Sequence, residues 1–245
     1  MIRKGLILLG SLFIATTAHA SITYFNSDFE SAIDTGSAIV DGSNVLNQVF
    51  GDVSLSSFGS LSGNALVFNP NVDSYEQVSL TLGAGAPNYH VEFDLETHNL
   101  VGSGYGFAML ADTPQVRNLN VGDCCGNSVS LFGSSSGPVS IGYFTDDTLM
   151  HVVADMDLAN NLWSVSISGV GSITTTFDSA GGDVNSIRFS LNPALGGVGL
   201  DSSVYAAIDN LSVSTVPLPA AFWLFLSGFA SLCTSALVTK KTQQT

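Results

Sequence analysis

The segment "DMDLANNLWSVSISG", residues 155–169, decides the fold class of this chain. Trp163, Val165 and Ile167 alternate with small or polar residues, and a period of two is the pattern of a half-buried β-strand. The short connection Ala159–Asn160–Asn161 has the composition of a tight turn. We therefore expect a β-hairpin here rather than a helix.

The same period of two recurs along the chain. In "YHVEFDL" the residues Tyr89, Val91, Phe93 and Leu95 share one face, and His90, Glu92 and Asp94 share the other. "EQVSLTL" and "SIRFSL" alternate in the same way, and Gly-, Ser-, Asn- and Pro-rich turns separate the segments. About ten to twelve short strands over about 195 residues predict a single all-β sandwich domain spanning residues 21–215.

The charge distribution excludes one class of function. The chain of 245 residues has a formal net charge of −14, yet residues 21–219 contain all 20 acidic residues and, as basic ones, only Arg117 and Arg188, a net charge of −18. Binding to nucleic acid depends on Lys and Arg contacts with phosphates, so we expect no nucleic-acid partner. A strongly negative surface keeps the protein soluble and attracts divalent cations.

The N-terminus reads "MIRKGLILLGSLFIATTAHA". Arg3 and Lys4 precede an apolar run that is too short for a membrane anchor, and "AHA" is a small-residue cleavage site. Residues 1–20 are therefore predicted to be a secretory signal peptide, and the protein is predicted to be exported.

The order of the β-segments also carries a resemblance. "SGNALVF", "QVSLTL", "YHVEFDL" and "GYGFAMLAD" are followed by "HVVADMDLANNLWSVSISG" and finally by "YAAIDNLSV". This series resembles the concanavalin A-like lectin/glucanase jelly roll, as in laminin-G-like modules of exported bacterial proteins. The resemblance implies a jelly-roll sandwich over most of residues 21–215 and a lectin-like use of it.

The C-terminal segment, residues 216–245, begins "VPLPAAFWLFLSG". Residues 220–238 carry no charge, and a helix of that length would be about 29 Å long, close to the thickness of a membrane core. Lys240 and Lys241 follow it and favour a cytoplasmic C-terminus. We expect one transmembrane helix; a buried core helix is the alternative.

Val216, Pro217, Leu218, Pro219 and Ala220, followed by the apolar span and the basic end, resemble the PEP-CTERM sorting signal in its VPLPA form. That signal belongs to exopolysaccharide-producing Gram-negative bacteria. The resemblance implies a precursor anchored in the inner membrane, cleavage near the proline motif by a membrane transpeptidase of the exosortase type, and a mature protein at the cell surface or in the extracellular polysaccharide matrix.

Glu92, Asp94 and Glu96 form an E-x-D-x-E sequence. It resembles the catalytic strand of laminarinase-type jelly-roll glycosidases, which implies that Glu92 is the nucleophile, Glu96 the acid/base and Asp94 the residue that tunes them. The alternative is a solvated outer face of a strand. His90, His98 and His151 show no spacing that pairs a histidine with a nucleophile, and we expect each to be a separate surface or edge residue.

A second set of carboxylates predicts a calcium site. Asp28 and Glu30 follow the first strand, and Asp209, with Asn210 beside it, lies in the last; in many jelly-roll modules these strands are neighbours near a structural Ca²⁺, which takes six to eight oxygen ligands. Surface carboxylates on adjacent strands are the alternative. Asp146–Asp147 and Asp155/Asp157 are interpreted as acidic turns, with a loop cation site as their alternative.

Cys124 and Cys125 are adjacent and match no zinc-binding spacing. In an exported protein they predict a local disulfide within one loop, with intermolecular pairing as the alternative. Taken together, the sequence predicts an exported, non-enzymatic protein that associates with extracellular polysaccharide. A secreted glycoside hydrolase using Glu92 and Glu96 is the alternative, and a purely structural matrix protein is a further one.

Overall fold

The structure, a computed structural model, describes residues 21–51, 53–70, 75–82, 88–112, 117–123, 126–132, 137–176, 184–193 and 201–215. These residues form 17 β-strands and contain no helix, so none that could cross a membrane. The strands are β1 (Thr23–Ser27), β2 (Ile33–Asp34), β3 (Ala38–Asp41), β4 (Asn44–Phe50), β5 (Ser54–Ser56), β6 (Ala65–Phe68), β7 (Glu76–Thr81), β8 (Asn88–His98), β9 (Tyr105–Asp112), β10 (Arg117–Asp123), β11 (Gly126–Phe132), β12 (Val139–Tyr143), β13 (Met150–Asp157), β14 (Leu162–Ile167), β15 (Gly171–Thr176), β16 (Ser186–Pro193) and β17 (Tyr205–Thr215).

The strand count is higher than the ten to twelve expected from the sequence. The N-terminal quarter explains part of the difference, because β2, β3 and β5 have only two to four residues each. A strand that short shows no alternation that a sequence pattern could reveal.

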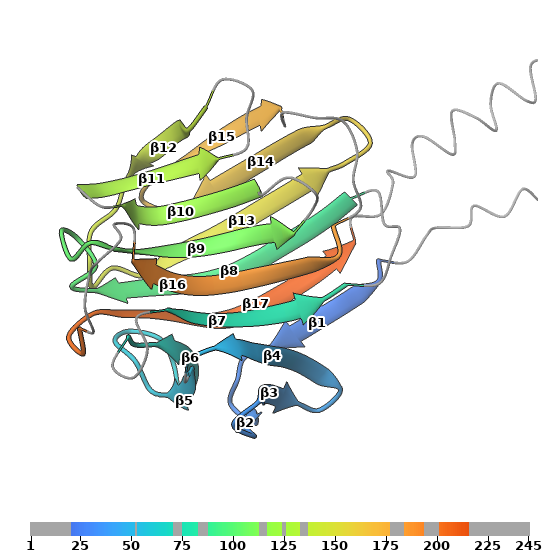
Figure 1. Cartoon of the computed structure of the whole chain (residues 1–245). Coiled ribbons are helices and arrows are strands. Elements are labelled where there is room, and N and C mark those ends of the chain that lie inside the picture. The colour runs from blue at the N-terminus through green and yellow to red at the C-terminus, as the bar shows by residue number, and fades with distance from the viewer. Residues whose placement is uncertain are drawn as a thin grey trace, which may run out of the picture. The chain divides into compact units, whose positions relative to one another are not determined.

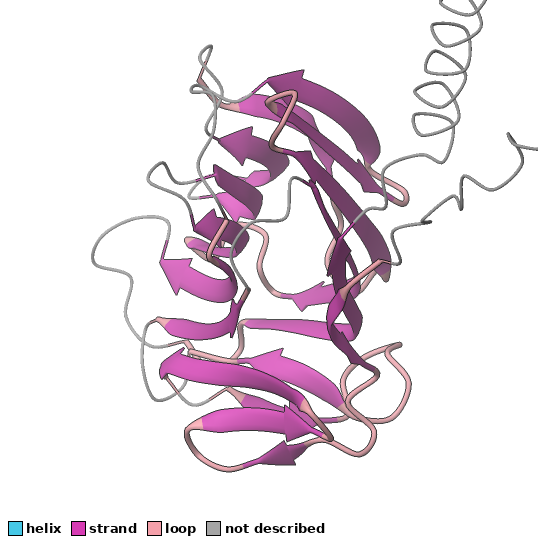
Figure 2. Cartoon of the chain, turned by 90° about the vertical axis from the view of Figure 1, so that its right-hand side faces the viewer, coloured by secondary structure: helices cyan, strands magenta, loops and turns pink. Residues whose placement is uncertain are grey.

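The strands form two antiparallel sheets that lie face to face (Figures 1 and 2). Sheet 1 has the order β15-β14-β13-β8-β17-β6-β5, and β1 also pairs with β17. Sheet 2 has the order β12-β11-β10-β9-β16-β7-β4-β3-β2. The predicted all-β sandwich is confirmed, and residues 22–215 form one compact unit.

Aromatic side chains join the two sheets in the core. Phe93 of β8 in sheet 1 lies with its ring centroid 5.3 Å from Phe189 of β16 and 6.4 Å from Phe107 of β9, both in sheet 2. All three side chains are fully buried. The inward residues of each strand thus supply the core, as the alternating pattern predicts.

The hairpin predicted around residues 155–169 is confirmed. β13 and β14 pair from Val152↔Ile167 to Asp157↔Leu162, and residues 158–161 make the turn. Asn161 adopts a positive φ of 59°, a conformation that asparagine accepts more readily than most residues. Trp163, Val165 and Ile167 are all buried, so the expected inward face is also correct.

The first and last strands are neighbours, as expected. β1 pairs antiparallel with the second half of β17, while β6 pairs with its first half. The register between β17 and β8 shifts between Asp209 and Ser212, which marks a β-bulge. Asn210, inside this bulge, has a φ of 51° and is exposed on the outer side of sheet 1.

A loop covers one end of the outer face of sheet 1. Residues 57–64, between β5 and β6, contribute Leu61 to a small cluster with Ala65, Val67 and Ala207, against which Phe58 and Tyr205 also lie. This cluster is separate from the core between the sheets. It divides the outer face of β8 into an open part around residues 90–94 and a covered part at residue 96.

Candidate functional site

The open part of β8 presents three polar side chains to one side. His90, Glu92 and Asp94 alternate with Tyr89, Val91 and Phe93, and the latter three are fully buried in the core. β8 lies in the middle of sheet 1, between β13 and β17. Each outward side chain therefore has a neighbour on both adjoining strands.

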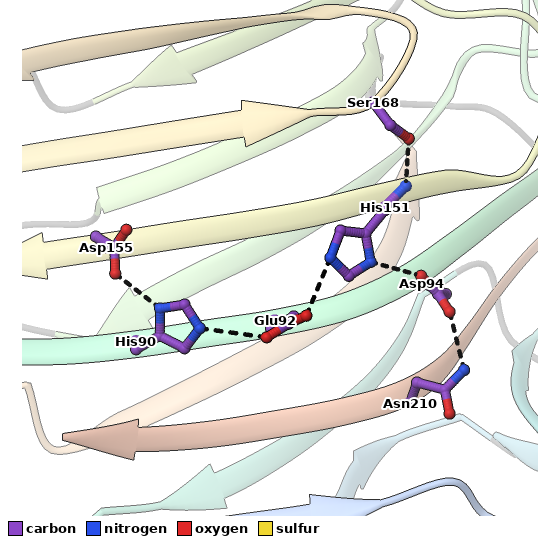
Figure 3. Close-up of polar contacts among 7 residues, drawn as sticks. All are labelled: His90, Glu92, Asp94, His151, Asp155, Ser168 and Asn210. Atoms are coloured by element: carbon purple, nitrogen blue, oxygen red, sulfur yellow. Dashed lines mark hydrogen bonds and ion pairs between the residues drawn. The ribbon is translucent and has the colours of Figure 1, made fainter. Parts of the chain in front are cut away.

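These neighbours form a continuous polar network across three strands (Figure 3). Asp155 Oδ1 lies 2.7 Å from His90 Nδ1, and His90 Nε2 lies 3.3 Å from Glu92 Oε2. Glu92 Oε1 lies 3.0 Å from His151 Nε2, and His151 Nδ1 lies 2.8 Å from Asp94 Oδ1. Asn210 Nδ2 donates to Asp94 Oδ2 at 2.8 Å. We refer to these six residues as the ladder: Asp155, His90, Glu92, His151, Asp94 and Asn210.

The register of β8 with β13 accounts for the ladder. His151 stands directly opposite Asp94, and Asp155 stands directly opposite His90. Side chains that face each other across antiparallel strands are close enough to bond directly. The backbone N–H of His151 also donates to Ser168 Oγ at 2.8 Å, which holds this end of β13 to the turn after β14.

Histidines and carboxylates alternate along the ladder. Both ring nitrogens of His90 and of His151 face carboxylate oxygens, whereas a neutral imidazole has one N–H to donate. Partial burial of the His90 ring works against its protonation, but the hydrogen bonds and charges of Asp155 and Glu92 outweigh it and raise the pKa of His90 above its ordinary value. The strands of sheet 1 contain no Lys or Arg.

The third residue of the E-x-D-x-E sequence is placed differently. Glu96 is 3 % exposed, and its Oε2 accepts hydrogen bonds from the Ser60 N–H at 2.8 Å and from Ser60 Oγ at 2.6 Å. The loop approaches so closely that a Cβ on Gly59 would lie 1.9 Å from Glu96 Oε1. Glu92 and Asp94 therefore belong to the ladder, whereas Glu96 is enclosed under the loop.

A row of aromatic rings adjoins the covered end of β8. The Tyr205 ring lies 6.2 Å from the His98 ring and 5.7 Å from the Phe58 ring, measured between centroids. His98 Nδ1 lies 2.6 Å from Asp147 Oδ1. We refer to His98, Tyr205 and Phe58 as the aromatic row. Its rings are partly exposed, and Glu96 with its covering loop lies between them and Asp94 of the ladder.

The residues of the predicted calcium site lie near one another. Asp209 is 1 % exposed, and its Oδ1 accepts the Asn210 N–H at 2.7 Å. Burial raises the pKa of Asp209; the hydrogen bond from Asn210 opposes the rise, and the nearby carboxylates of Asp94, Glu30 and Asp28 add to it. A surface hollow of about 300 Å³ next to them is lined by Asn26, Ser27, Asp28, Asp41 and Asn210.

In the part of the chain that the structure describes, no group of three or more His, Cys, Asp or Glu side chains is positioned to hold a metal ion. The calcium prediction therefore has support from strand pairing and from charge, but none from ligand geometry.

The acidic turns fasten the chain locally. Asp146 accepts hydrogen bonds from the Thr97 hydroxyl at 2.8 Å and the Val101 N–H at 2.9 Å, so it ties its loop to the end of β8. Asp157 accepts the Asn160 N–H at 3.0 Å within the β13–β14 turn. Both carboxylates are thus used in holding turns, which favours the interpretation as acidic turns over a loop cation site.

Sequence reasoning missed the role of the histidines. They were expected as separate surface residues, but all three pair with carboxylates on the outer face of sheet 1. The alternating pattern of the sequence placed His90, Glu92 and Asp94 on the same face of one strand. The positions of His151 and Asp155 opposite them depend on strand register. Cys124 and Cys125, the sorting motif at residues 216–220, the apolar span and Lys240–Lys241 lie outside the described residues.

Comparison with known proteins shows likeness in fold. No protein-family model matches the chain, and no curated protein matches it. Among solved structures, a sialidase aligns with a TM-score of 0.53 at 15 % identity, over 70 % of this chain and 17 % of the sialidase. A binding domain of botulinum neurotoxin serotype D/C aligns with a TM-score of 0.52 at 11 % identity, over 84 % of this chain and 51 % of that one.

A third structure is of botulinum neurotoxin type C, for which cell entry is described as dependent on interaction with two ganglioside molecules; it aligns with a TM-score of 0.51 at 13 % identity. The chain spans about half the length of these toxin chains and about a sixth of the sialidase. At such identities the likeness establishes the fold alone, so the function has to be argued from the residues of this chain. The chain is therefore an antiparallel β-sandwich of the fold that these toxin binding domains share.

Proposed function

We propose that this domain is a non-enzymatic, lectin-like module that binds polysaccharide on the outer face of sheet 1, through the ladder and the aromatic row. The observation that carries the proposal is the ladder itself. It presents carboxylate, imidazole and amide groups on one partly exposed face.

The chemistry of this face suits a sugar. Each carboxylate oxygen of Glu92 and Asp94 faces one partner within the ladder, and an ionised carboxylate has about four acceptor sites in total. Acceptors therefore remain for the hydroxyl groups of a ligand. The rings of Tyr205 and Phe58 add partly exposed apolar surface farther along the same face, beyond Glu96, and a combination of apolar contact with a few placed polar groups is typical of small-ligand sites.

Two features favour binding over hydrolysis. A glycosidase of the retaining type needs a nucleophile and an acid/base about 5–5.5 Å apart on either side of the scissile bond. Here Glu92 is held between two imidazoles, while Glu96 is bonded to Ser60 and enclosed by the loop. The laminarinase-type alternative requires the loop to uncover Glu96.

One experiment separates these functions. The full-length protein, purified in detergent, is incubated with immobilised β-glucans, and both retention and new reducing ends are measured. We expect retention without reducing ends, reduced retention for the double variant Asp94→Asn/Asn210→Ala, and unchanged retention for Asp34→Asn, which removes a surface charge from sheet 2.

Each other outcome has a clear meaning. Reducing ends that disappear in Glu92→Gln and Glu96→Gln would establish the glycoside hydrolase. Absence of both retention and turnover on every glycan would favour a purely structural matrix protein.

We further propose that the chain is exported and sorted by its two terminal segments. The signal-peptide pattern of residues 1–20 and the V-P-L-P-A motif followed by an apolar span and two lysines support this proposal. An exosortase-type transpeptidase would act on the membrane-held precursor, and the mature domain would reach the cell surface or the polysaccharide matrix.

The intact mass of the protein isolated from its own cells tests the sorting proposal. We expect a chain that begins at Ser21 and ends near residues 216–220, and we expect Pro217→Ala/Pro219→Ala to retain the tail. A native protein that keeps residues 220–245 would contradict sorting without affecting the proposed glycan binding.

A further inference from the structure

The two sheets end in four edge strands, which differ in how their free sides are protected. β5 and β2 have only three and two residues. β12 has five, its register with β11 shifts between Val129 and Ser130, and Pro138 precedes it. β1, which adjoins part of β17, also has a register shift, and the Asn44 amide donates to its Asn26 carbonyl. Short length, bulges and proline keep an edge from pairing with another chain. β15 has none of these features.

β15 is a regular strand with one side unpaired. Its six residues pair with β14 without a shift in register. In the part of the chain that the structure describes, no strand pairs with its other side. Ser172, Thr174 and Thr176 are exposed on the outer side of sheet 1, and Ile173 on the inner side is only partly buried. The free side of β15 therefore presents N–H and C=O groups next to an incompletely covered part of the core.

The whole end of the sandwich where β15 lies is uncharged. β11, β12, β14 and β15 contain no Asp, Glu, His, Lys or Arg, and they lie together at one end of the two sheets (Figure 1). The sheets meet there, because the Ile141 carbonyl oxygen would lie 2.8 Å from a Cβ on Gly171. Residues 21–219 have a net charge of −18, so two copies of the domain repel each other where charged surfaces meet. At this end a second copy can approach without like charges in contact.

A second copy also fits the geometry of the strand. Two identical strands that pair antiparallel are related by a twofold axis, so each copy offers the same groups to the other. With Thr174 on that axis, Ser172 faces Thr176 of the second copy and Ile173 faces Thr175 of the second copy. Outward hydroxyls then meet hydroxyls, and the partly buried side chains of each copy cover those of the other.

We propose that β15 is the docking edge for a second copy of this chain, and that the two 8-stranded sheets thereby continue into one. The twofold axis is perpendicular to the sheet, so both outer faces lie on the same side. With three strand spacings in each copy and one between the copies, the two β8 strands are about 34 Å apart. One dimer then presents two ladders to the same polymer. This bivalence rests on the proposed glycan binding, whereas the dimer itself does not.

Sedimentation of the full-length protein in detergent and reducing agent, over a range of concentrations, measures the association. The paired surface is small, so we expect a reversible dimer whose fraction rises with concentration. Thr175→Lys introduces an ammonium group that reaches water in a single copy but is covered in the dimer, so it should weaken association about tenfold or more. Thr175→Val changes the same side chain without adding a charge and should keep the dimer.

Two further measurements assign the contact to β15. Ser140→Lys, at an exposed position on β12, should leave association unchanged. Hydrogen exchange of the wild-type protein should show that amides of residues 171–176 become protected as the concentration rises, whereas those of β12 do not. The exchange measurement needs no substitution, so it decides the matter even where the melting temperature shows that Thr175→Lys folds poorly.

The failures of the two proposals differ. A wild-type protein that is monomeric at every concentration, or association that is equally strong in Thr175→Lys, overturns the dimer and leaves the proposed glycan binding in place. Association that Ser140→Lys weakens and Thr175→Lys does not also overturns the assignment to β15. A wild-type dimer that β-glucans do not retain overturns the proposed function and leaves the dimer in place.

Discussion

At His90 an imidazole ring lies between two carboxylates from different strands, Asp155 of β13 and Glu92 of β8 itself. A protonated ring can donate to both, whereas a neutral ring leaves a lone pair facing one of them. The ring therefore ties β13 to β8 more firmly when it is charged. Protonation of His90 therefore affects how firmly β13 and β8 are held together on this face of the sheet.

The stability of the domain should depend on pH through His90. The folded-state pKa of His90 lies above its ordinary value of 6.5, because the bonds to Asp155 and Glu92 outweigh the effect of burial. The stabilisation is therefore complete below that ordinary value and is lost as the pH rises through the folded-state pKa. Urea unfolding at pH 5.5 and pH 8 should show a larger loss for wild type than for His90→Gln. Equal losses would contradict this assignment.

Asp209 has the opposite effect on stability. Burial raises its pKa, so its ionised form destabilises the folded state at neutral pH, and the penalty disappears as the pH falls through the folded-state pKa towards the ordinary value of 3.8. An amide side chain at position 209 would keep a carbonyl oxygen that accepts the Asn210 N–H. We expect Asp209→Asn to raise the melting temperature at pH 7.5 but not at pH 4, measured by circular dichroism. Asp34→Asn, at an exposed position, is the control.

At the scale of elements, the loop of residues 57–64 decides what the outer face of β8 can do. Gly59 has a φ of 52°, and a Cβ there would clash with the Glu96 carboxylate at 1.9 Å. The glycine lets the loop lie close against β8, and the backbone N–H and the hydroxyl of its neighbour Ser60 then donate to the carboxylate. The open ladder and the covered Glu96 are consequences of this one close approach.

Gly59→Ala tests that close approach, with Gly36→Ala as a matched control. Gly36 also has a positive φ, of 75°, but nothing lies within 4 Å of a Cβ built on it. The control should lose about 1–2 kcal/mol from backbone strain alone, and Gly59→Ala should lose more because the loop has to lift from Glu96. Urea unfolding measures both free energies. Equal losses would show that the loop moves freely.

For the whole molecule, stability depends on the aromatic contacts between the sheets. Phe93→Ala removes a fully buried ring that touches Phe107 and Phe189, so it should lower the free energy of unfolding by about 3–5 kcal/mol. Ile33→Ala, at a residue 65 % exposed, should change it by less than about 0.5 kcal/mol. Chemical denaturation gives both values. A small effect at Phe93 would mean that the sheets do not depend on this contact.

The two outer faces of the sandwich differ in chemistry. Sheet 1 presents alternating carboxylates and imidazoles, and sheet 2 presents the exposed Phe50 ring, which lies edge-on to Tyr75.

By itself the sequence determined the fold class and the inward and outward sides of the longer strands. The reason is local: alternation in β8, β13 and β14 assigns Phe93 and Trp163 to the core and His90, Glu92 and Asp94 to the surface without reference to any partner strand. Strands of two to four residues carry too little pattern, and they were undercounted.

Only the tertiary structure decided which outward side chains meet. Asp94 faces His151 from 57 positions away and bonds Asn210 from 116 positions away, and Glu96 is enclosed by a loop 36 positions before it. The register between such strands is set by how their inner residues fit together in the core and by bulges such as those at Asn210 and Val49, and no local pattern contains that information. The ladder follows from that register.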